Sequence, residues 1–328
     1  MRWIINPNDE LLEKWKVFVS EHEDKNFFQS YEFVKLYNSN GYSVKTFVAI
    51  ENEKIVASYN VLFLKDKFGI LSSLTKRAVT WGMPLTNSSS LLKDSINAVI
   101  EHCKNDFIYF EIRPLYPISP IKCNSLNELK FKLEQHYTVF NNLELDFFSL
   151  FHSGRKKNIR RAQRNELLIF KELKSAEEIN HAGELIITLY RNLRLPCPNI
   201  DFFNSIKDFP SIKTFGVYFK EKLVACRIVL TYLNSIYDWY ASATDEGKAI
   251  FANDFIVHEV FNWGQKNGYR HFDFGGAGKS NQNYGVRDYK LKFGGNLVEI
   301  GRAVYINKPF KYEIGKIGFK TLKLLRGK

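Results

Sequence analysis

Residues 45–63 read KTFVAIENEKIVASYNVLF, and residues 213–231 read KTFGVYFKEKLVACRIVLT. Nine of these 19 positions are identical without a gap. In both copies, β-forming residues flank a polar turn that contains Glu-Lys, which is the pattern of a β-hairpin. Residues 99–112 and 261–274 match in the same order, each as a helix end, a Lys-Asn turn and a strand. Two ordered matches, at offsets of 168 and 162 residues, predict a duplicated α/β domain. Ahead of the second hairpin, residues 176–192 have the apolar spacing of an amphipathic helix.

The length and composition are those of a globular protein. The 328 residues suffice for two domains of ordinary size. Hydrophobic residues make up 45% and charged residues 25%, which excludes a disordered chain, a collagen and a disulfide miniprotein. No run of about 18 apolar residues occurs, so we expect no membrane-spanning helix. The charged start is unlike a signal peptide. Four cysteines without close pairing predict reduced thiols in a cytoplasmic protein.

The net charge of +12 is concentrated in two segments. Residues 154–164 hold six basic side chains and no acid, and residues 308–328 hold seven basic side chains and one acid. Such local clusters indicate an anionic partner better than a diffuse basic surface does. The second segment places apolar residues on one helix face, so it packs on the protein body or lies on an anionic membrane. The first segment contains the candidate anion-binding residues Arg155, Lys156, Arg160 and Arg161. They would bind phosphates of a nucleic acid or of a nucleotide sugar, or else form a solvated helix start.

The segment from residue 237 to residue 276 is the most informative part of the sequence. Asp238 and Tyr240 alternate along a predicted strand and are expected to share one face. The turn Thr244-Asp245-Glu246-Gly247-Lys248-Ala249 follows, and Asn253 is the expected N-cap of the next helix. A strand, a glycine turn and a helix N-terminus can hold a pyrophosphate, although an ordinary strand–helix loop has the same pattern. The candidate pyrophosphate-binding residues of this segment are Thr244, Gly247, Ala249 and Asn253.

Searches for other chemistries are negative. No metal-ligand spacing and no GxSxG nucleophile motif occur. The glycine-rich loop at residues 275–279 departs from a P-loop, because Asp273 stands where the first glycine is required. His258, beside Glu259, has the pattern of a solvated or hydrogen-bonded helix residue more than that of a catalytic base. We therefore expect no metal, no covalent nucleophile and no nucleotide hydrolysis.

Two long stretches resemble a known family. Residues 237–276 (YDWYASATDEGKAIFANDFIVHEVFNWGQKNGYRHFDFGG) and 288–305 (DYKLKFGGNLVEIGRAVY) are similar to the second domain of the Fem-type transferases. These are the peptidoglycan interpeptide-bridge enzymes of the GNAT acyltransferase superfamily. NFFQSYEF at 26–33 resembles their first-domain motif, and HSGRKKNIRRAQRNEL at 152–167 resembles the opening of their second domain. The resemblance implies an α/β (α+β) fold with two tandem GNAT-like domains, each a mixed, mostly antiparallel sheet flanked by helices.

The resemblance also implies a division of the chain. Residues 1–150 would form a degenerate GNAT-like domain on the acceptor side. Residues 151–307 would form the catalytic, donor-side GNAT-like domain, and residues 308–328 the basic C-terminal helix. The family's first-domain tryptophan is replaced by Phe33, and its acceptor-phosphate lysine falls on Tyr37, with Lys35 nearby.

The family's FK..F and FD.GG motifs point to site residues. The FK..F lysine falls on Lys290, which we expect to stabilise charge on the donor carbonyl or phosphate. Asp238 is then the candidate base or amine-orienting group, and Tyr240 a candidate proton relay. The FD.GG motif falls on Asp273, Gly275 and Gly276, which are expected to shape the donor-binding loop.

Three functions follow from the resemblance and the charge pattern. The first is transfer of an aminoacyl group from aminoacyl-tRNA, as co-substrate, to an amine of a peptidoglycan or other cell-envelope precursor. The second is acyl-CoA-dependent N-acylation of an amino sugar or lipid-linked precursor, for which the family's Q/R-x-x-G-x-G/A loop is matched at Gly247 and Ala249 but not at Thr244. The third is a non-catalytic tandem protein that binds anions. We expect no tightly bound cofactor and no DNA partner, and a cytoplasmic location with peripheral contact to the inner membrane face as an option.

Overall fold

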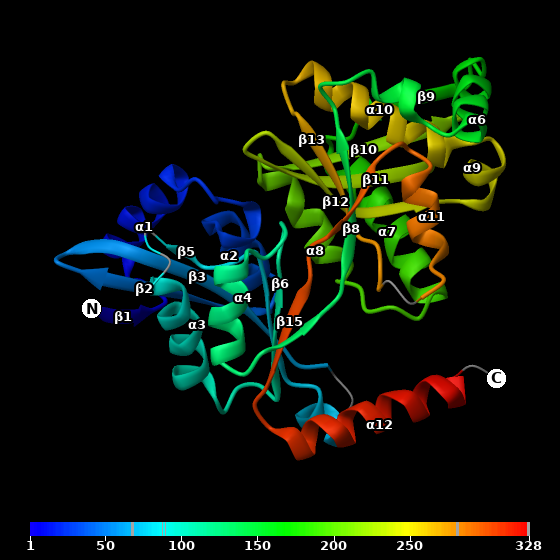
Figure 1. The fold of residues 1–328 in the computed structure, drawn as a ribbon. Helices are drawn as coiled ribbons and strands as arrows, with labels where there is room; N and C mark the ends of the chain where they lie inside the picture. The colour runs from blue at the N-terminus through cyan, green and yellow to red at the C-terminus, as the bar shows by residue number, and fades with distance from the viewer. Residues whose placement is uncertain (67–68, 87, 89, 280–281, 327–328) are drawn as a thin grey trace. The chain divides into compact units, whose positions relative to one another are not determined.

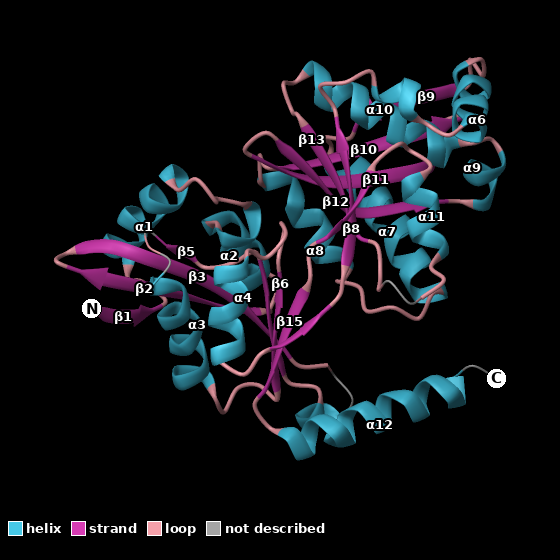
Figure 2. Ribbon diagram, viewed as in Figure 1, coloured by secondary structure: helices cyan, strands magenta, loops and turns pink. Residues whose placement is uncertain are grey.

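The chain folds as two compact units, each built around one mixed sheet (Figure 2). The computed structural model describes residues 1–328 except 67–68, 87, 89, 280–281 and 327–328. Unit 1 comprises Met1–Gln135 and Ile300–Lys328, and unit 2 comprises His136–Glu299. The expected α/β architecture with two sheets is thereby confirmed.

In unit 1, β4 and β6 are parallel and the other paired neighbours are antiparallel. The strand order is β1 (Arg2–Ile5), β2 (Ser43–Glu51), β3 (Lys54–Leu64), β4 (Arg77–Trp81), β6 (Tyr109–Arg113), β15 (Arg302–Ile306) and β7 (Lys132–Glu134), with β5 (Leu85–Thr86) paired to β3. The helices of unit 1 are α1 (Asp9–Glu21), α2 (Tyr31–Ser39), α3 (Ser90–Cys103), α4 (Pro120–Glu128) and α12 (Pro309–Arg326), with 3₁₀ turns at Phe27–Gln29 and Gly69–Leu74.

In unit 2, β12 and β13 are the parallel neighbours. The strand order is β9 (Leu168–Glu172), β10 (Ile212–Phe219), β11 (Lys222–Tyr232), β12 (Ser235–Ala243), β13 (His271–Gly276), β8 (Tyr137–Asn142) and β14 (Asn296–Glu299). The helices of unit 2 are α5 (Phe147–Leu150), α6 (Ser153–Gln163), α7 (Ala176–Asn192), α8 (Ile200–Ser205), α9 (Asp245–Ala249), α10 (Ala252–Lys266) and α11 (Gly285–Leu291), with a 3₁₀ turn at Ile206–Asp208.

The predicted duplication extends to backbone detail. The two hairpins turn through paired residues with positive φ, at 49° and 63° for Asn52 and Glu53 and at 48° and 65° for Lys220 and Glu221. Two successive left-handed residues are the mark of a type I′ turn, whose twist matches that of the flanking strands. The register of β2 shifts between residues 49 and 50, and that of β10 shifts between 217 and 218. Both the turn and the bulge thus recur at the offset of 168 residues.

Each unit contains one strand from the stretch of sequence expected to form the other unit. The expected boundaries at 150/151 and 307/308 are therefore corrected. β8 precedes residue 150 but pairs with β13 and β14 of unit 2. β15 follows unit 2 in sequence but pairs with β6 and β7 of unit 1, as Figure 1 shows by its orange strand beside cyan β6. The physical reason is long-range strand pairing, which local sequence patterns do not specify. The chain therefore passes between the units at 135/136 and again at 299/300.

The two faces of the unit 2 sheet carry different helices. Val229 of β11 packs in one apolar cluster with Val257 and Val260 of α10. Cys226, three positions earlier on the same strand, lies on the other face, where its thiol donates to the carbonyl of Ala182 in α7 at 3.5 Å. Because side chains alternate along a strand, α10 covers one face and α7 the other.

Candidate functional site

A bulge in β12 separates the two residues expected to act together. Asp238 pairs with Val229 of β11, whereas Tyr240 pairs with the next residue, Ile228. The extra residue, Trp239, shifts the alternation of side chains, as β-bulges do. Asp238 consequently points to the α10 face and Tyr240 to the α7 face, and the expectation of one shared face is wrong. The rings of Tyr190 and Phe203 lie 5.7 and 5.3 Å from that of Tyr240.

The strands β12 and β13 separate next to Asp238. They pair at Ser235–Tyr237 and His271–Asp273, although β12 continues to Ala243 and β13 to Gly276. Backbone groups beyond these pairs are therefore not joined in a ladder between the two strands. Such separated strands leave a place where a substrate carbonyl or chain can meet backbone N–H groups.

Asp238 forms a buried ion pair that the sequence did not reveal. The guanidinium of Arg227 in β11 donates to its Oδ2, and Arg227 is only 2% exposed. Among the described residues, Oδ1 of the same carboxylate has no hydrogen-bond partner. Burial raises the pKa of Asp238, while the charges of Arg227 and Lys290 act in the opposite direction. One carboxylate oxygen is thus held in place, and the other lies buried without a hydrogen-bond partner among the described residues.

Lys290 lies on α11 and ties down the end of β13. Its ammonium donates to three successive carbonyl oxygens, those of Phe274 (2.7 Å), Gly275 (3.2 Å) and Gly276 (2.8 Å). Three bonds use all three N–H donors of an ammonium. Burial lowers the pKa of Lys290, and the nearby carboxylates of Asp238 and Asp273 oppose that shift. These bonds hold the end of β13 beside Asp238, and the expected role of Lys290 on the donor carbonyl or phosphate stays a prediction.

Asp273 fixes the loop that Lys290 holds. Its Oδ1 accepts hydrogen bonds from the Thr138 hydroxyl of β8 and from the N–H of Gly275 at 2.8 Å. Gly275 adopts φ +66°, and a Cβ there would lie 3.2 Å from the Tyr237 hydroxyl, so glycine is required at this turn. The neighbouring Gly276 is exposed. Burial raises the pKa of Asp273 to about 6, against the hydrogen bonds that favour its ionised form.

This pKa predicts a pH-dependent stability. A carboxyl group in an unfolded chain titrates near about 3.9, so folding favours the protonated form of Asp273. The contribution of protonated Asp273 to the free energy of unfolding is fully present below about pH 4 and is lost as the pH rises through about 6. We expect the stability of the wild type relative to Asp273→Asn to fall by about 2 kcal/mol between pH 4 and pH 7. Urea unfolding of both proteins at each pH measures this, and a difference independent of pH would contradict it.

The N-terminal turns of α6 and α10 are joined to α11. The guanidinium of Arg155 donates to both carboxylate oxygens of Asp254 at 2.6 Å and lies 4.4 Å from the centre of the Tyr289 ring. Asn253 donates to the Tyr289 hydroxyl at 2.9 Å. Asn253 is not the N-cap of α10 as expected, because Phe251, at φ 64°, takes that position without a side-chain cap. These contacts fix α6 relative to the helix that carries Lys290.

Only part of the expected anion-binding set faces solvent. Arg155 is used in the buried ion pair with Asp254, and Lys156 donates to the carbonyl of Ser149 at 2.6 Å. The other face of α6 carries exposed cations at spacings i, i+3, i+4 and i+7, which form one stripe along a helix. The members of this cationic stripe are Lys157, Arg160, Arg161 and Arg164.

The candidate acceptor residues of unit 1 also divide. Lys35 of α2 is exposed. Tyr37 is 6% exposed, and its ring lies 4.6 Å from Phe33 and 5.3 Å from Tyr42. Tyr37 is therefore a core residue of unit 1, and its expected contact with acceptor phosphates is corrected.

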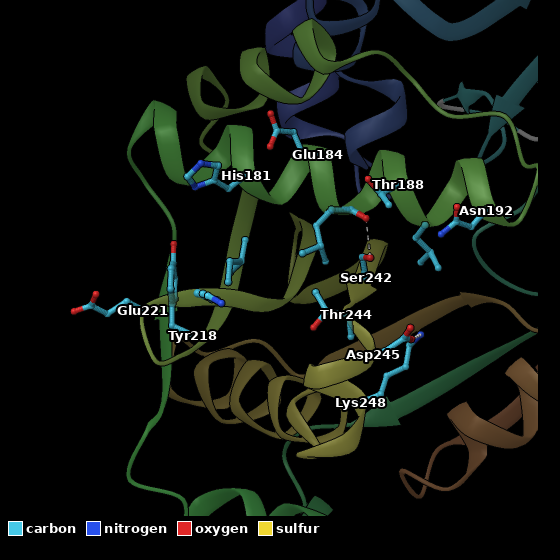
Figure 3. Close-up of a pocket in the computed structure, with 15 residues that line it drawn as sticks. His181, Glu184, Thr188, Asn192, Tyr218, Glu221, Ser242, Thr244, Asp245 and Lys248 are labelled. Atoms are coloured by element: carbon cyan, nitrogen blue, oxygen red, sulfur yellow. Dashed lines mark hydrogen bonds and ion pairs between the residues drawn. The ribbon is translucent and has the colours of Figure 1, made fainter.

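A pocket of about 680 Å³ lies between α7, the β10–β11 hairpin and the end of β12 (Figure 3). It lies on the α7 face, opposite Asp238. Thr244, Asp245 and Lys248 of the expected pyrophosphate loop line it, as do the acids Glu184 and Glu221. The acids on its rim are unfavourable for a pyrophosphate.

The loop itself is closed by its own hydrogen bonds. The Thr244 side chain accepts from the N–H of Gly247 at 2.9 Å, and the Thr244 carbonyl accepts from the N–H of Lys248 at 2.9 Å. A Cβ on Gly247 would collide with the Val224 carbonyl of β11, so its glycine is explained by packing. Ala249, the last residue of α9, is exposed. The N–H groups of Gly247 and Lys248 are therefore already bonded within the loop, and the binding of a pyrophosphate there stays a prediction.

The part of unit 2 that contains this site matches a family model. Residues 153–291 match the model described as an acetyltransferase (GNAT) domain. The chain therefore contains a GNAT-type acyltransferase domain, as the resemblance implied. No curated protein matches the chain in sequence. Among the described residues of the GNAT domain and of the rest of the chain, no group of His, Cys, Asp or Glu is arranged to hold a metal ion.

Solved structures show that the GNAT fold is present twice. FemX is 13% identical, with a TM-score of 0.70 over 96% of this chain and 100% of that one. The L-PGS structure from Bacillus licheniformis is 16% identical, with a TM-score of 0.62 over 94% and 96% of the two chains. A tandem GNAT protein from the clavulanic acid biosynthesis pathway is 9% identical, with a TM-score of 0.55 over 93% and 99%. At these identities the likeness establishes the fold.

Proposed function

We propose that this acyltransferase moves an aminoacyl group from aminoacyl-tRNA to an amine of a cell-envelope precursor. The sequence resembles the Fem-type transferases, and FemX is among the structures with the same fold over the whole chain. The observation that carries the choice of donor is the cationic stripe of α6 (Lys157, Arg160, Arg161 and Arg164). A stripe of four exposed cations suits the sugar-phosphate backbone of RNA, and it is fixed to α11 through Arg155.

The reaction needs positioned groups and no covalent enzyme intermediate. The amine nitrogen attacks the ester carbonyl, the new C–N bond forms, and the ester C–O bond to the tRNA ribose breaks. The amine proton leaves nitrogen and finally reaches the ribose oxygen, so that atoms and charge balance. Orientation of the two substrates, proton transfer and stabilisation of the oxyanion are the contributions that a protein makes to such a step.

Asp238 is suited to the proton step. Its Oδ2 is held by Arg227, and its Oδ1 lies buried and unpaired among the described groups. That oxygen can accept a hydrogen bond from the attacking amine and then its proton, which the raised pKa of the carboxyl group favours. Lys290 keeps the end of β13 in place beside it, and the backbone of the separated strands is the source of N–H groups for the oxyanion.

A pair of variants tests the assignment of Asp238. We expect Asp238→Asn to lower the rate of transfer by about a hundredfold or more, since general-base contributions are of this size. Tyr240→Phe serves as the control, because the bulge turns that side chain to the opposite face, and its rate should stay within about threefold of wild type. A single-turnover assay with saturating acceptor measures both. Equal loss in the two variants would refute the separation of Asp238 from Tyr240.

Acyl-CoA-dependent transfer is the second candidate, favoured by the match to an acetyltransferase model. The loop after β12 argues against it, because Asp245 and Glu246 are exposed acids and the N–H groups of Gly247 and Lys248 are already bonded. An aminoacyl-tRNA donor would not have to place a pyrophosphate beside these acids and bonded N–H groups.

The donor is tested by transfer assays with charged tRNA and with acetyl-CoA. A nucleotide-linked muropeptide with a free side-chain amine serves as acceptor, and amide product is measured by mass spectrometry. The proposal predicts product from aminoacyl-tRNA and none from acetyl-CoA. Product from acetyl-CoA alone would overturn it.

The cationic stripe gives an independent prediction for the same assay. Replacing Arg161 and Arg164 by glutamate should raise the KM for aminoacyl-tRNA at least about tenfold, because two phosphate contacts are lost. The matched control changes two exposed lysines of the same unit, Lys174→Glu with Lys220→Glu, which alters the net charge equally. An equal change in KM for both double variants would assign the effect to overall charge and not to α6.

A further inference from the structure

The helix α12 has apolar side chains on two opposite faces. On one face, the ring of Tyr312 lies 5.4 Å from that of Tyr109 in β6, in an edge-on arrangement. Gly315 on the same face approaches the Leu74 carbonyl, to which a Cβ would come within 3.1 Å. This face attaches α12 to the rest of unit 1. Side chains on the opposite face of the helix point away from this attachment.

The opposite face forms an exposed apolar ridge. Phe310, Ile314 and Ile317 recur at i, i+4 and i+7, which places them in one row along the helix. They are 80%, 37% and 63% exposed. At 100° per residue, this row lies across the helix axis from Tyr312 and Gly315. Large apolar side chains gathered in this way mark an interaction surface more often than isolated ones do.

The segment around the ridge is strongly cationic. Residues 308–328 contain seven basic side chains and one acid. Lys311 is exposed beside the ridge, and Lys316 pairs with Glu313 at 3.2 Å. No helix among the described residues is long and apolar enough to cross a bilayer. An apolar row within a basic helix is the pattern of a segment that lies in the membrane interface.

We propose that α12 binds the surface of an anionic lipid bilayer through Phe310, Ile314 and Ile317. The ridge enters the boundary between head groups and acyl chains, while the lysines meet lipid phosphates. The helix has 18 residues, so it would lie along about 27 Å of the surface. This inference does not depend on the identity of the acyl donor.

Two other partners would either cover the apolar ridge or neutralise the positive charge, but not both. A second copy of the chain would cover the apolar ridge but would bring two segments of net charge +6 together, which is unfavourable at moderate salt. RNA would neutralise the lysines but would leave Phe310 and the two isoleucines in water. An anionic bilayer covers the ridge and neutralises the charge at once.

Co-sedimentation with sucrose-loaded vesicles tests the proposal on the full chain. We expect the wild type to sediment with phosphatidylcholine vesicles that contain 25% phosphatidylglycerol, to remain unbound with pure phosphatidylcholine, and to be released by 0.5 M NaCl. The variant Phe310→Ser, Ile314→Ser, Ile317→Ser should bind at least about tenfold more weakly. The control variant Val17→Ser, Ile121→Ser changes residues of unit 1 that are 53% and 64% exposed and should bind as the wild type does.

The outcomes separate the possible occupants. Phe310 and Ile317 are mostly exposed and Ile314 is 37% exposed, so the melting temperature of the triple variant should fall by no more than about 4 °C. Lys311→Glu, which leaves the ridge intact, should also weaken binding to phosphatidylglycerol vesicles. Equal binding of the triple variant and the wild type, or no vesicle binding by the wild type, would overturn the proposal. A wild-type dimer in sedimentation velocity, or tRNA binding, that the triple variant loses would overturn it in favour of that partner.

Discussion

A chain that ends at Glu299 is expected to lose the folded state of unit 1, whereas a chain that ends at Asn307 keeps it. β15 (Arg302–Ile306) lies between β6 and β7 and pairs with both. Its Ala303 is fully buried in the apolar core of unit 1. Removing an internal strand leaves two rows of unpaired backbone groups and exposes the apolar core to water. Each of these effects costs more free energy than the whole free energy of unfolding of a typical domain.

The two truncations differ by one strand, which makes them a matched pair. Hydrogen exchange with mass spectrometry reports the two units separately. In the chain that ends at Glu299, amides of β2, β3 and β6 should exchange rapidly, while those of β10, β11 and β12 stay protected. Protected amides in β6 of the shorter chain, or loss of protection in unit 2 instead, would contradict the exchange of strands between the units.

Breaking the Arg227–Asp238 pair is expected to have the second largest effect. Asp238→Leu should lower the free energy of unfolding by about 3–5 kcal/mol, the usual cost of an uncompensated buried charge. Arg227→Met should cost less. Its partner carboxylate already has a raised pKa and can take up a proton, whereas a guanidinium cannot lose its charge.

The double variant distinguishes pairing from packing. Arg227→Met with Asp238→Leu leaves no buried charge at this position, so it should be more stable than Asp238→Leu alone. Urea unfolding of the four proteins gives the coupling free energy. Additive losses would show that the two side chains contribute through packing and not as an ion pair.

The sequence predicted those helices and hairpins whose residue pattern lies within a short stretch of the chain. The hairpins of the repeat and the helix at residues 176–192 are found where their periodicity placed them, because turn chemistry and helical spacing act within about ten residues. The strand exchange of β8 and β15 was not predictable, since both strands pair with partners distant in sequence. A single sequence contains no signal for such a choice.

Within the site, the errors have specific causes. The bulge at Trp239 inverted the expected relation of Asp238 to Tyr240, and no glycine or proline marks it in the sequence. Arg227 was missed because it lies in the apolar run VACRIVL, although a lone basic residue in a buried strand was a usable signal that a counter-ion lies nearby. Asn253 was read as a cap because its residue type favours caps, whereas its side chain bonds Tyr289.

The most direct test of the donor is ligand-induced thermal stabilisation, measured without turnover. Wild-type protein is heated alone, with charged tRNA, with a nucleotide-linked muropeptide and with acetyl-CoA, each at concentrations from 1 μM to 1 mM. A ligand that binds the folded state raises the melting temperature by mass action. At a concentration a hundredfold above Kd, it adds about 2.7 kcal/mol to the free energy of unfolding. The account predicts a rise with charged tRNA that Arg161→Glu, Arg164→Glu reduces, and no rise with acetyl-CoA. A rise with acetyl-CoA and none with charged tRNA would contradict it.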